Sequence, residues 1–185
     1  MLTAMTYQPS YLALLSRITH AETDAECYLN AWAAATPSSD VRRIISTIAL
    51  REGEHGKAFA KRISELGFEP APCLESKTAE RMPIAASTTL TDREKFEQLG
   101  FGKPADPANP DQYAAMFADP TIDIRTGELL GRYVSEERDS IRMFRSCYEE
   151  LCAESEPAVS ASTQCIEDRL TGIEQCLNQL VARLA

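Results

Sequence analysis

Four long stretches of the chain repeat apolar residues at alternating steps of three and four, which is the spacing of one face of an α-helix. They cover approximately residues 10–35, 39–66, 124–152 and 157–184. Amphipathic helices of this length bury their apolar stripes by packing against one another. The pattern therefore predicts an all-α fold, an antiparallel four-helix bundle made of two helical hairpins.

The region between the second and third predicted helices, residues 68–123, has a different character, because seven of the ten prolines of the chain fall in it. Within it, Thr91 and Glu94 form a capping-box pattern that predicts one short helix, and the rest is predicted as loop. Either hairpin alone would leave its apolar stripe exposed. We therefore interpret this region as one long crossover within a single domain, residues 1–185.

The chain is acidic, with a net charge of −9 at pH 7. Binding to nucleic acids or to anionic membranes normally requires a basic surface, which such a chain is poorly placed to supply. No apolar run is long enough to cross a membrane, and the first residues lack the basic region and apolar core of a signal peptide. We therefore expect a cytoplasmic protein with six reduced cysteines and no nucleic-acid or membrane partner.

Ionisable residues interrupt the apolar stripes. Glu22 occupies a stripe position of the first helix, and Glu137 occupies one of the third. In the second helix Glu52 and His55 stand three residues apart on the stripe, so both project from the buried face. Their apolar neighbours on the three stripes include Ile18, Leu29, Ile48, Phe59, Tyr133, Ile141 and Phe144. Packing of these stripes would turn three carboxylates and one imidazole toward a common interior.

An internal repeat adds a fourth carboxylate. When the second half of the chain is shifted back by 115 residues, Glu137 falls on Glu22. In the same register Glu167 falls on Glu52, so the two glutamate pairs have the same separation of 30 residues. Glu167 itself lies beside the apolar stripe of the fourth helix, and its place in the interior follows from the repeat alone. The repeat fails at Leu170, which stands where a second histidine would recur.

Four carboxylates that face one interior need compensation, because an unpaired buried carboxylate costs several kcal/mol. Such groups can be protonated, paired with Lys or Arg, or bound to cations. No Lys or Arg occupies the stripes near these glutamates, whereas two divalent metal ions would balance four negative charges. Carboxylates and neutral imidazole are suitable ligands for iron or manganese. The sequence thus indicates a dinuclear metal site of Glu22, Glu52, His55, Glu137 and Glu167.

A second interpretation needs no metal. In it Glu22 and Glu137 lie at the rims of exposed faces, and His55 is a core histidine whose hydrogen bonds are satisfied by the protein. A Glu-x-x-His pair alone does not separate the two interpretations, because that spacing often occurs by chance. The other histidine, His20, is two residues from Glu22 and is expected at the surface.

Three segments of the chain resemble the metal-binding helices of the ferritin-like superfamily, and within it the rubrerythrin-like branch. They are HAETDAECYLNAWAA in the first helix, EGEHGKAFAKRI in the second and GRYVSEERDSIRMF in the third. Members of this branch hold two irons between carboxylate bridges, and they react with peroxide or oxygen or oxidise ferrous iron. The resemblance implies a di-iron oxidoreductase of the peroxidase or ferroxidase type. Manganese stays an alternative metal on the chemistry of the ligands alone.

The resemblance also assigns roles to the predicted ligands. By position they are Glu22 and His55 on the first metal, the bridges Glu52 and Glu167, and the terminal ligand Glu137 on the second metal. A nearby tyrosine would hydrogen-bond a ligand, and Tyr28 and Tyr133 are the two candidates. The resemblance further implies a homodimer.

Two departures from the family pattern bear on function. Leu170 replaces the second histidine, so the second metal position is weakened and the site would hold one iron instead of two if that position is lost. The chain also lacks the paired CxxC motifs of a rubredoxin-like tail, so redox cycling would need an external electron donor. These departures leave a second function open, that of a catalytically degenerate ferritin-like bundle acting as an oligomeric binding or regulatory protein.

Overall fold

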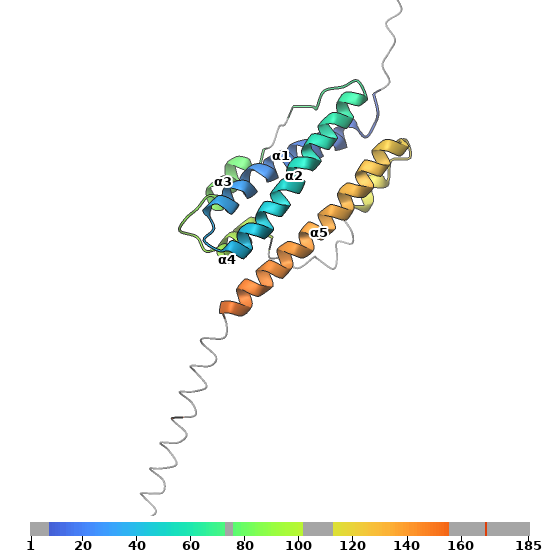
Figure 1. Ribbon diagram of the computed structural model, residues 1–185. Coiled ribbons are helices and arrows are strands. Elements are labelled where there is room, and N and C mark those ends of the chain that lie inside the picture. The colour runs from blue at the N-terminus through green and yellow to red at the C-terminus, as the bar shows by residue number, and fades with distance from the viewer. Residues whose placement is uncertain (1–7, 73–75, 102–112, 156–168, 170–185) are drawn as a thin grey trace, which may run out of the picture. The chain divides into compact units, whose positions relative to one another are not determined.

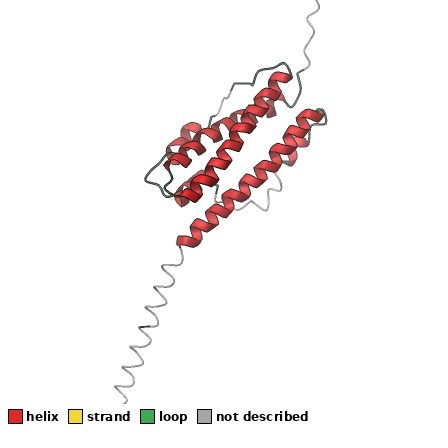
Figure 2. Cartoon of the chain, viewed as in Figure 1, coloured by secondary structure: helices red, strands yellow, loops and turns green. Residues whose placement is uncertain are grey.

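The computed structural model describes residues 8–72, 76–101 and 113–155, together with Arg169. All regular secondary structure in these ranges is helical (Figure 2), which confirms the predicted all-α class. No helix in them has both the length and the apolar character that crossing a membrane requires.

Helices α1 (Leu12–Ala35) and α2 (Ser39–Glu65) form a hairpin and pack side by side (Figure 1). Their ends agree with the predicted ones to within two residues. Ser38 caps α2, because its hydroxyl accepts a hydrogen bond from the backbone N–H of Val41 at 3.3 Å. Gly67 follows the end of α2 with a φ of +86°, the left-handed conformation that glycine adopts without strain.

The crossover has more regular structure than predicted. Helix α4 (Asp92–Leu99) is the short helix expected from its capping box: the Thr91 hydroxyl accepts from the N–H of Glu94 at 3.2 Å, and the Thr91 N–H donates to the Glu94 carboxylate at 2.8 Å. The prediction of loop is wrong at two other places in the described crossover. Helix α3 (Thr78–Ala85) and a 3-10 turn, η1 (Ala114–Phe117), also form. The sequence did not predict α3, because a proline, Pro83, lies in its last turn and proline normally indicates a loop.

Helix α5 (Ile124–Ser155) begins where the sequence predicted and ends three residues later than expected. One apolar core joins α1, α2 and α5 and includes Leu12, Leu15, Ile18, Phe59, Ile63, Leu130, Tyr133 and Val134. Ile141 departs from the predicted stripe, since 39% of its surface is exposed. It lines the wall of a cavity between α1 and α5, which explains why its side chain is not covered.

The chain divides into two units, Met1–Tyr148 and Glu149–Ala185. The first unit contains α1 to α4 and most of α5, and it holds the core and all the contacts described below. Among the described residues the second unit contains the last turns of α5. The predicted fourth helix lies outside the described residues apart from Arg169, and so do Glu167 and Leu170.

Asp123, the residue before α5, ties this helix to the hairpin. Its carboxylate accepts hydrogen bonds from the N–H of Thr126 at 3.1 Å and from the Thr126 hydroxyl at 2.7 Å, as an N-cap does. It also accepts from the hydroxyl of Tyr11 at 2.6 Å and from the guanidinium of Arg62 at 2.9 and 3.0 Å. Tyr11 precedes α1 and Arg62 lies in the last turn of α2, so one carboxylate fixes the register of α5 against both helices.

We expect Asp123→Ala to lower the free energy of unfolding by about 2–3 kcal/mol, because a helix cap and the hydrogen bonds to Arg62 and Tyr11 are lost together. Denaturant unfolding followed by circular dichroism would measure the loss. Asp40→Ala is the control, since the Asp40 carboxylate is exposed and lies 3.9 Å from Arg43. It should change stability by less than about 0.5 kcal/mol. Equal losses in the two variants would show that Asp123 does not anchor α5.

Candidate metal centre

Three helices bring four of the predicted residues together. Helix α1 contributes Glu22, α2 contributes Glu52 and His55, and α5 contributes Glu137. One ligand atom of each residue lies within 4.8 Å of the ligand atoms of the other three. Glu22, Glu52 and His55 are only 5%, 6% and 5% exposed. Each residue occupies a stripe position, where helix packing turns the side chain inward.

Helices α1 and α2 approach closely at Gly56, the residue that follows His55 on α2. A Cβ on Gly56 would lie 3.0 Å from the hydroxyl oxygen of Thr23 and 3.4 Å from backbone atoms of α1. A Cβ on Gly53 would overlap the carboxylate of Glu26. Gly56 therefore permits the close packing that carries the α1 carboxylate to the ligand atoms of α2, and Gly53 leaves room for the Glu26 side chain.

The imidazole of His55 has carboxylates on both sides. Its Nε2 lies 2.7 Å from Oε2 of Glu136. Its Nδ1 lies 3.5 Å from Oε2 of Glu22 and 3.5 Å from Oε1 of Glu137. The ring of Tyr133 packs edge-on against the imidazole, with 5.0 Å between the ring centres. Nothing in the stripe pattern singles out Glu136, and the one signal that could have found it is its position next to Glu137.

The two candidate tyrosines have different partners. The Tyr133 hydroxyl donates a hydrogen bond to Oε1 of Glu22 at 2.9 Å, and the residue is buried. The Tyr28 hydroxyl instead accepts from the guanidinium of Arg81 at 2.9 Å, and that guanidinium lies 5.2 Å from the centre of the Tyr28 ring. Of these two candidates, Tyr133 is therefore the one that hydrogen-bonds a candidate ligand.

Burial and neighbouring charges act in opposite directions on the pKa values of His55 and Glu22. Burial disfavours the charged imidazole, but contacts with Glu137, Glu22 and Glu136 outweigh it and raise the pKa of His55 to about 10. Burial also disfavours a charged Glu22, but contacts with His55, Glu52 and Tyr133 outweigh it and lower the pKa of Glu22. At neutral pH the pair is therefore an imidazolium beside a carboxylate.

The pKa of Glu52 is raised, whereas that of Glu22 is lowered. Burial, a hydrogen bond with Glu22 and the charge of Glu137 all raise its pKa, so the Glu52 carboxyl keeps its proton at neutral pH and donates it to Glu22. The pKa of Glu137 is also raised, chiefly by burial. Protons on Glu52 and His55 thus compensate the negative charges of the cluster in the absence of a metal ion.

Three buried atoms of the cluster have no hydrogen-bond partner in the described part of the chain. They are Oε2 of Glu22, Nδ1 of His55 and Oε1 of Glu137. Buried polar atoms normally have partners, so three that face one another call for an additional group between them. Two carboxylate oxygens and an imidazole nitrogen are donors that iron and manganese accept. The residues present therefore fit a metal ion, and of the two ring nitrogens of His55 only Nε2 has a hydrogen-bond partner in the described chain.

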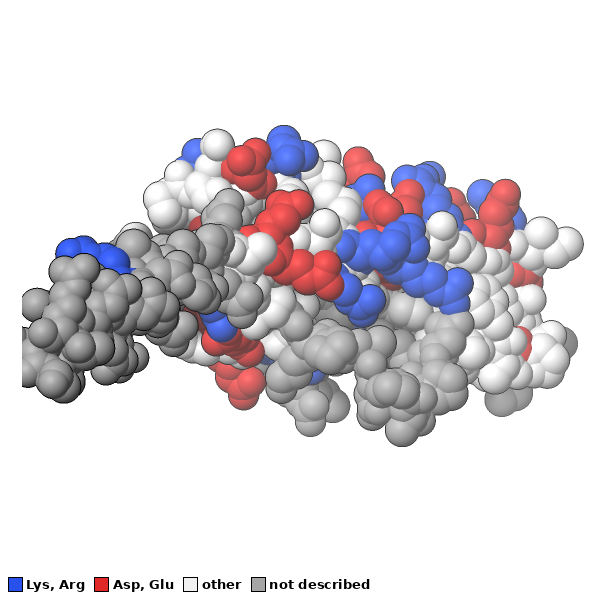
Figure 3. All heavy atoms as spheres, turned by 90° about the horizontal axis from the view of Figure 1, so that it is seen from below, with Lys and Arg blue, Asp and Glu red and all other residues white. Residues whose placement is uncertain are grey.

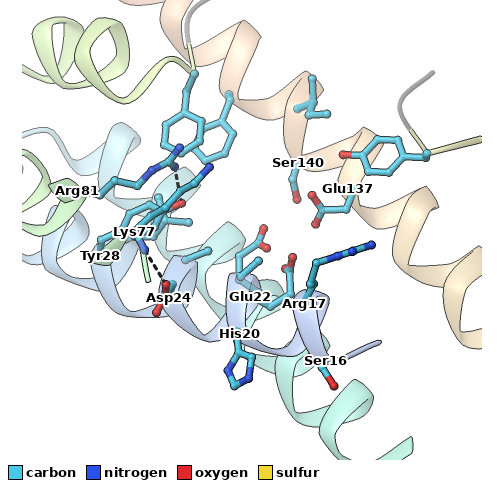
Figure 4. Close-up of a pocket in the computed structure, with 18 of the residues that line it drawn as sticks. Ser16, Arg17, His20, Glu22, Asp24, Tyr28, Lys77, Arg81, Glu137 and Ser140 are labelled. Atoms are coloured by element: carbon cyan, nitrogen blue, oxygen red, sulfur yellow. Dashed lines mark hydrogen bonds between the residues drawn. The ribbon is translucent and has the colours of Figure 1, made fainter. Parts of the chain in front are cut away.

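A cavity of about 730 Å³ reaches the cluster from the side between α1 and α5. Figure 4 shows Glu22 and Glu137 reaching toward each other from these two helices. His20 points away from both carboxylates in the same view. It lies at the surface as expected and is half-buried, with its Nε2 2.6 Å from the carbonyl oxygen of Ala71. The cavity is large enough to admit a small molecule to the cluster.

Charged side chains outside the cluster form pairs of opposite charge between neighbouring helices. On the face shown in Figure 3, Lys and Arg side chains lie among Asp and Glu side chains. Ion pairs such as Arg51 with Asp139, 2.7 Å apart, and Lys57 with Glu26, 3.3 Å apart, join neighbouring helices. Water screens such exposed pairs, so each contributes little to stability. Strong electrostatic effects in the described chain are instead found where charges are buried or multiply paired, as in the cluster and at Asp123.

Within the described part of the chain, the fold and the cluster define a helical protein with a buried glutamate and histidine site that could hold a metal ion. Comparisons of the chain with models of protein families, with curated proteins and with solved structures found no match. Because Glu167 and Leu170 lie outside the described residues, the second metal position stays a prediction from the sequence.

Proposed function

We propose that this protein is a ferritin-like, non-haem metal protein that holds a carboxylate-bridged pair of iron or manganese ions. The observation that carries the proposal is the group of three buried, unpartnered ligand atoms on Glu22, His55 and Glu137. Glu22, Glu52 and His55 would hold the first ion. Glu137 and Glu167 would extend the site to a second ion, whose position lacks a histidine because of Leu170.

We also propose a more specific form of the fold. The fold would be a ferritin-like antiparallel four-helix bundle, with residues 157–184 as the fourth helix and residues 68–123 as the crossover. The α1–α2 hairpin and the apolar stripe of α5 support it, and so does the internal repeat. We also propose that the protein is cytoplasmic, as expected from its sequence, and that it is a homodimer, which the resemblance alone supports.

The chemistry proposed for this site is redox chemistry with oxygen or peroxide, or the oxidation of ferrous iron as a substrate, supplied by the bound metal pair. The residues of the chain would orient and protect the bound metal pair. Tyr133 fixes one oxygen of Glu22 through its hydroxyl. Glu22, Glu52 and His55 are buried, and the cavity between α1 and α5 gives small molecules access to the cluster. An external electron donor would complete each cycle.

A second candidate function is favoured by Leu170, which removes a nitrogen ligand from the second position. In that case the chain would be a catalytically degenerate bundle acting as an oligomeric binding or regulatory protein. Elemental analysis of protein produced in iron-supplemented and manganese-supplemented medium separates the two functions. About two metal ions per chain with peroxide-dependent turnover supports the oxidoreductase, whereas metal-free, inactive protein supports the degenerate bundle.

Metal binding should raise the melting temperature, because an ion that binds the folded cluster and not the unfolded chain stabilises the fold by mass action. At a free metal concentration of 100 times Kd the gain is about 2.7 kcal/mol. Thermal melts of metal-stripped protein with and without Mn²⁺ would measure it. Glu52→Gln should abolish most of the gain, while Glu54→Gln, on the exposed face of the same helix, should keep it. Identical melting of the wild-type protein with and without metal would remove the basis of the proposal.

A further inference from the structure

The residue next to Glu137 contacts the opposite side of the same imidazole. Successive residues of an α-helix project about 100° apart, so neighbouring side chains can reach around a ring from two directions. On α5 the Glu136 carboxylate reaches Nε2 of His55 at 2.7 Å, while Oε1 of Glu137 lies 3.5 Å from Nδ1. Two consecutive carboxylates therefore bracket the ring of His55.

The Glu136 carboxylate is itself held in place. Its Oε1 accepts a hydrogen bond from Nε of Arg132 at 2.9 Å, one helical turn earlier on α5. Its Oε2 is the atom that contacts His55. The cationic guanidinium of Arg132 pairs with this carboxyl group, which is therefore present as a carboxylate. An ionised carboxylate can only accept hydrogen bonds, so Nε2 is the ring nitrogen that must carry a proton.

The position of that proton decides which nitrogen can bind a metal ion. A neutral imidazole carries one proton, and when Nε2 holds it, the lone pair of Nδ1 is free. Nδ1 is buried, lacks a hydrogen-bond partner in the described chain and lies 3.5 Å from carboxylate oxygens of Glu22 and Glu137. The edge-on packing of Tyr133 restricts rotation of the ring. In this arrangement the lone pair of Nδ1 therefore faces the carboxylates of Glu22 and Glu137.

We propose that Glu136 is a positioning residue that fixes the tautomer and orientation of His55, so that Nδ1 is the metal-binding atom, and that Arg132 holds Glu136 for this purpose. The inference rests on the proposed metal-binding function and names a residue outside the ligand set. Hydrogen bonds to the distal nitrogen of a histidine ligand typically contribute 10-fold to 100-fold in metal affinity.

The test compares three variants of the full chain, with Zn²⁺ as the probe and a chelator as competitor. Glu136→Ala should weaken zinc binding by about 10-fold to 100-fold. Glu136→Gln should restore part of the affinity, because its amide oxygen can still accept from Nε2. Asp139→Asn is the matched control, since Asp139 also lies on α5 and accepts from Arg51 of α2 at 2.7 Å. It should bind zinc as the wild-type protein does.

Nitrogen-15 NMR gives a readout that a merely structural role would not move. The chain has two histidines, so histidine labelling yields two rings, and His20→Ala assigns them. In the zinc-bound wild-type protein we expect zinc on Nδ1 and the proton on Nε2 of His55. In Glu136→Ala we expect this preference to weaken.

Four outcomes decide the inference. Zinc on Nε2 in the wild-type protein would overturn it, and so would unchanged affinity in folded Glu136→Ala protein. Circular dichroism checks whether each variant folds. If Glu136→Ala does not fold, Glu136→Gln takes its place. Unchanged zinc affinity together with an unchanged tautomer in Glu136→Gln would also overturn the inference. A wild-type protein that binds no zinc, iron or manganese would instead overturn the proposed function and this inference with it.

Discussion

The affinity of the protein for a divalent metal ion should rise by up to about 100-fold per pH unit between roughly pH 6 and pH 9. Metal-free protein holds a proton on Glu52, whose pKa is raised by burial and by neighbouring carboxylates. It holds a second on Nδ1 of His55, whose pKa is raised to about 10 against the effect of burial. A metal ion that takes both ligands must displace both protons, so each tenfold fall in proton concentration favours binding about tenfold per proton. The dependence should weaken as the pH approaches 10.

Calorimetric titration with Mn²⁺ in two buffers of different ionisation enthalpy would count the released protons directly. We expect about two per ion near neutral pH. Glu52→Gln carries no titratable proton at this position, so its residual binding should release about one fewer. A metal affinity that does not change with pH would mean that the ligand atoms bind the ion without giving up protons, and the protonation described for the metal-free cluster would be wrong.

His55→Ala should lose most of the bound metal, because His55 supplies the nitrogen donor of the cluster and the other three ligands are carboxylates. Elemental analysis of the purified variant, expressed in metal-supplemented medium, would measure the loss. His20→Ala is the matched control, since the His20 side chain points away from Glu22 and Glu137. It should retain the metal content of the wild-type protein.

Folding must be checked separately in this pair, because His55 is buried and its replacement leaves a space. A His55→Asn variant keeps a polar side chain at the position and should also lose metal. Full metal content in folded His55→Ala or His55→Asn protein would exclude the cluster as the metal site.

The sequence predicted four residues of the site, and the reason is geometric. A helix that packs by its apolar stripe turns every stripe residue inward, so Glu22, Glu52, His55 and Glu137 could be placed without knowing their contacts. Glu136 could not be found in this way. It lies off the stripe, and its contact with the ring of His55 depends on the rotation of α5 about its own axis, which Asp123 fixes through contacts with two other helices.

The fold was predictable where local signals and burial agree. The hairpin of α1 and α2 and the start of α5 follow from long apolar stripes with caps, and α4 follows from its capping box. Helix α3 was missed because it is short and contains Pro83, which composition alone assigns to a loop. Ile141 was expected to be covered because of its stripe position, but a cavity wall exposes it. A periodic pattern gives the direction of a side chain and not the neighbour that covers it.

The site joins two parts of the chain that are far apart along the sequence, since His55 on α2 and Glu136 on α5 are separated by 81 residues. An ion held by ligands from both helices would act as a removable cross-link around a loop that contains the whole crossover. Closing a loop of this size restricts the unfolded chain by roughly 4 kcal/mol of conformational entropy. A protease cut within the crossover would then leave two fragments, already joined by the apolar core, whose association is tighter while the ion is bound and weaker after a chelator removes it.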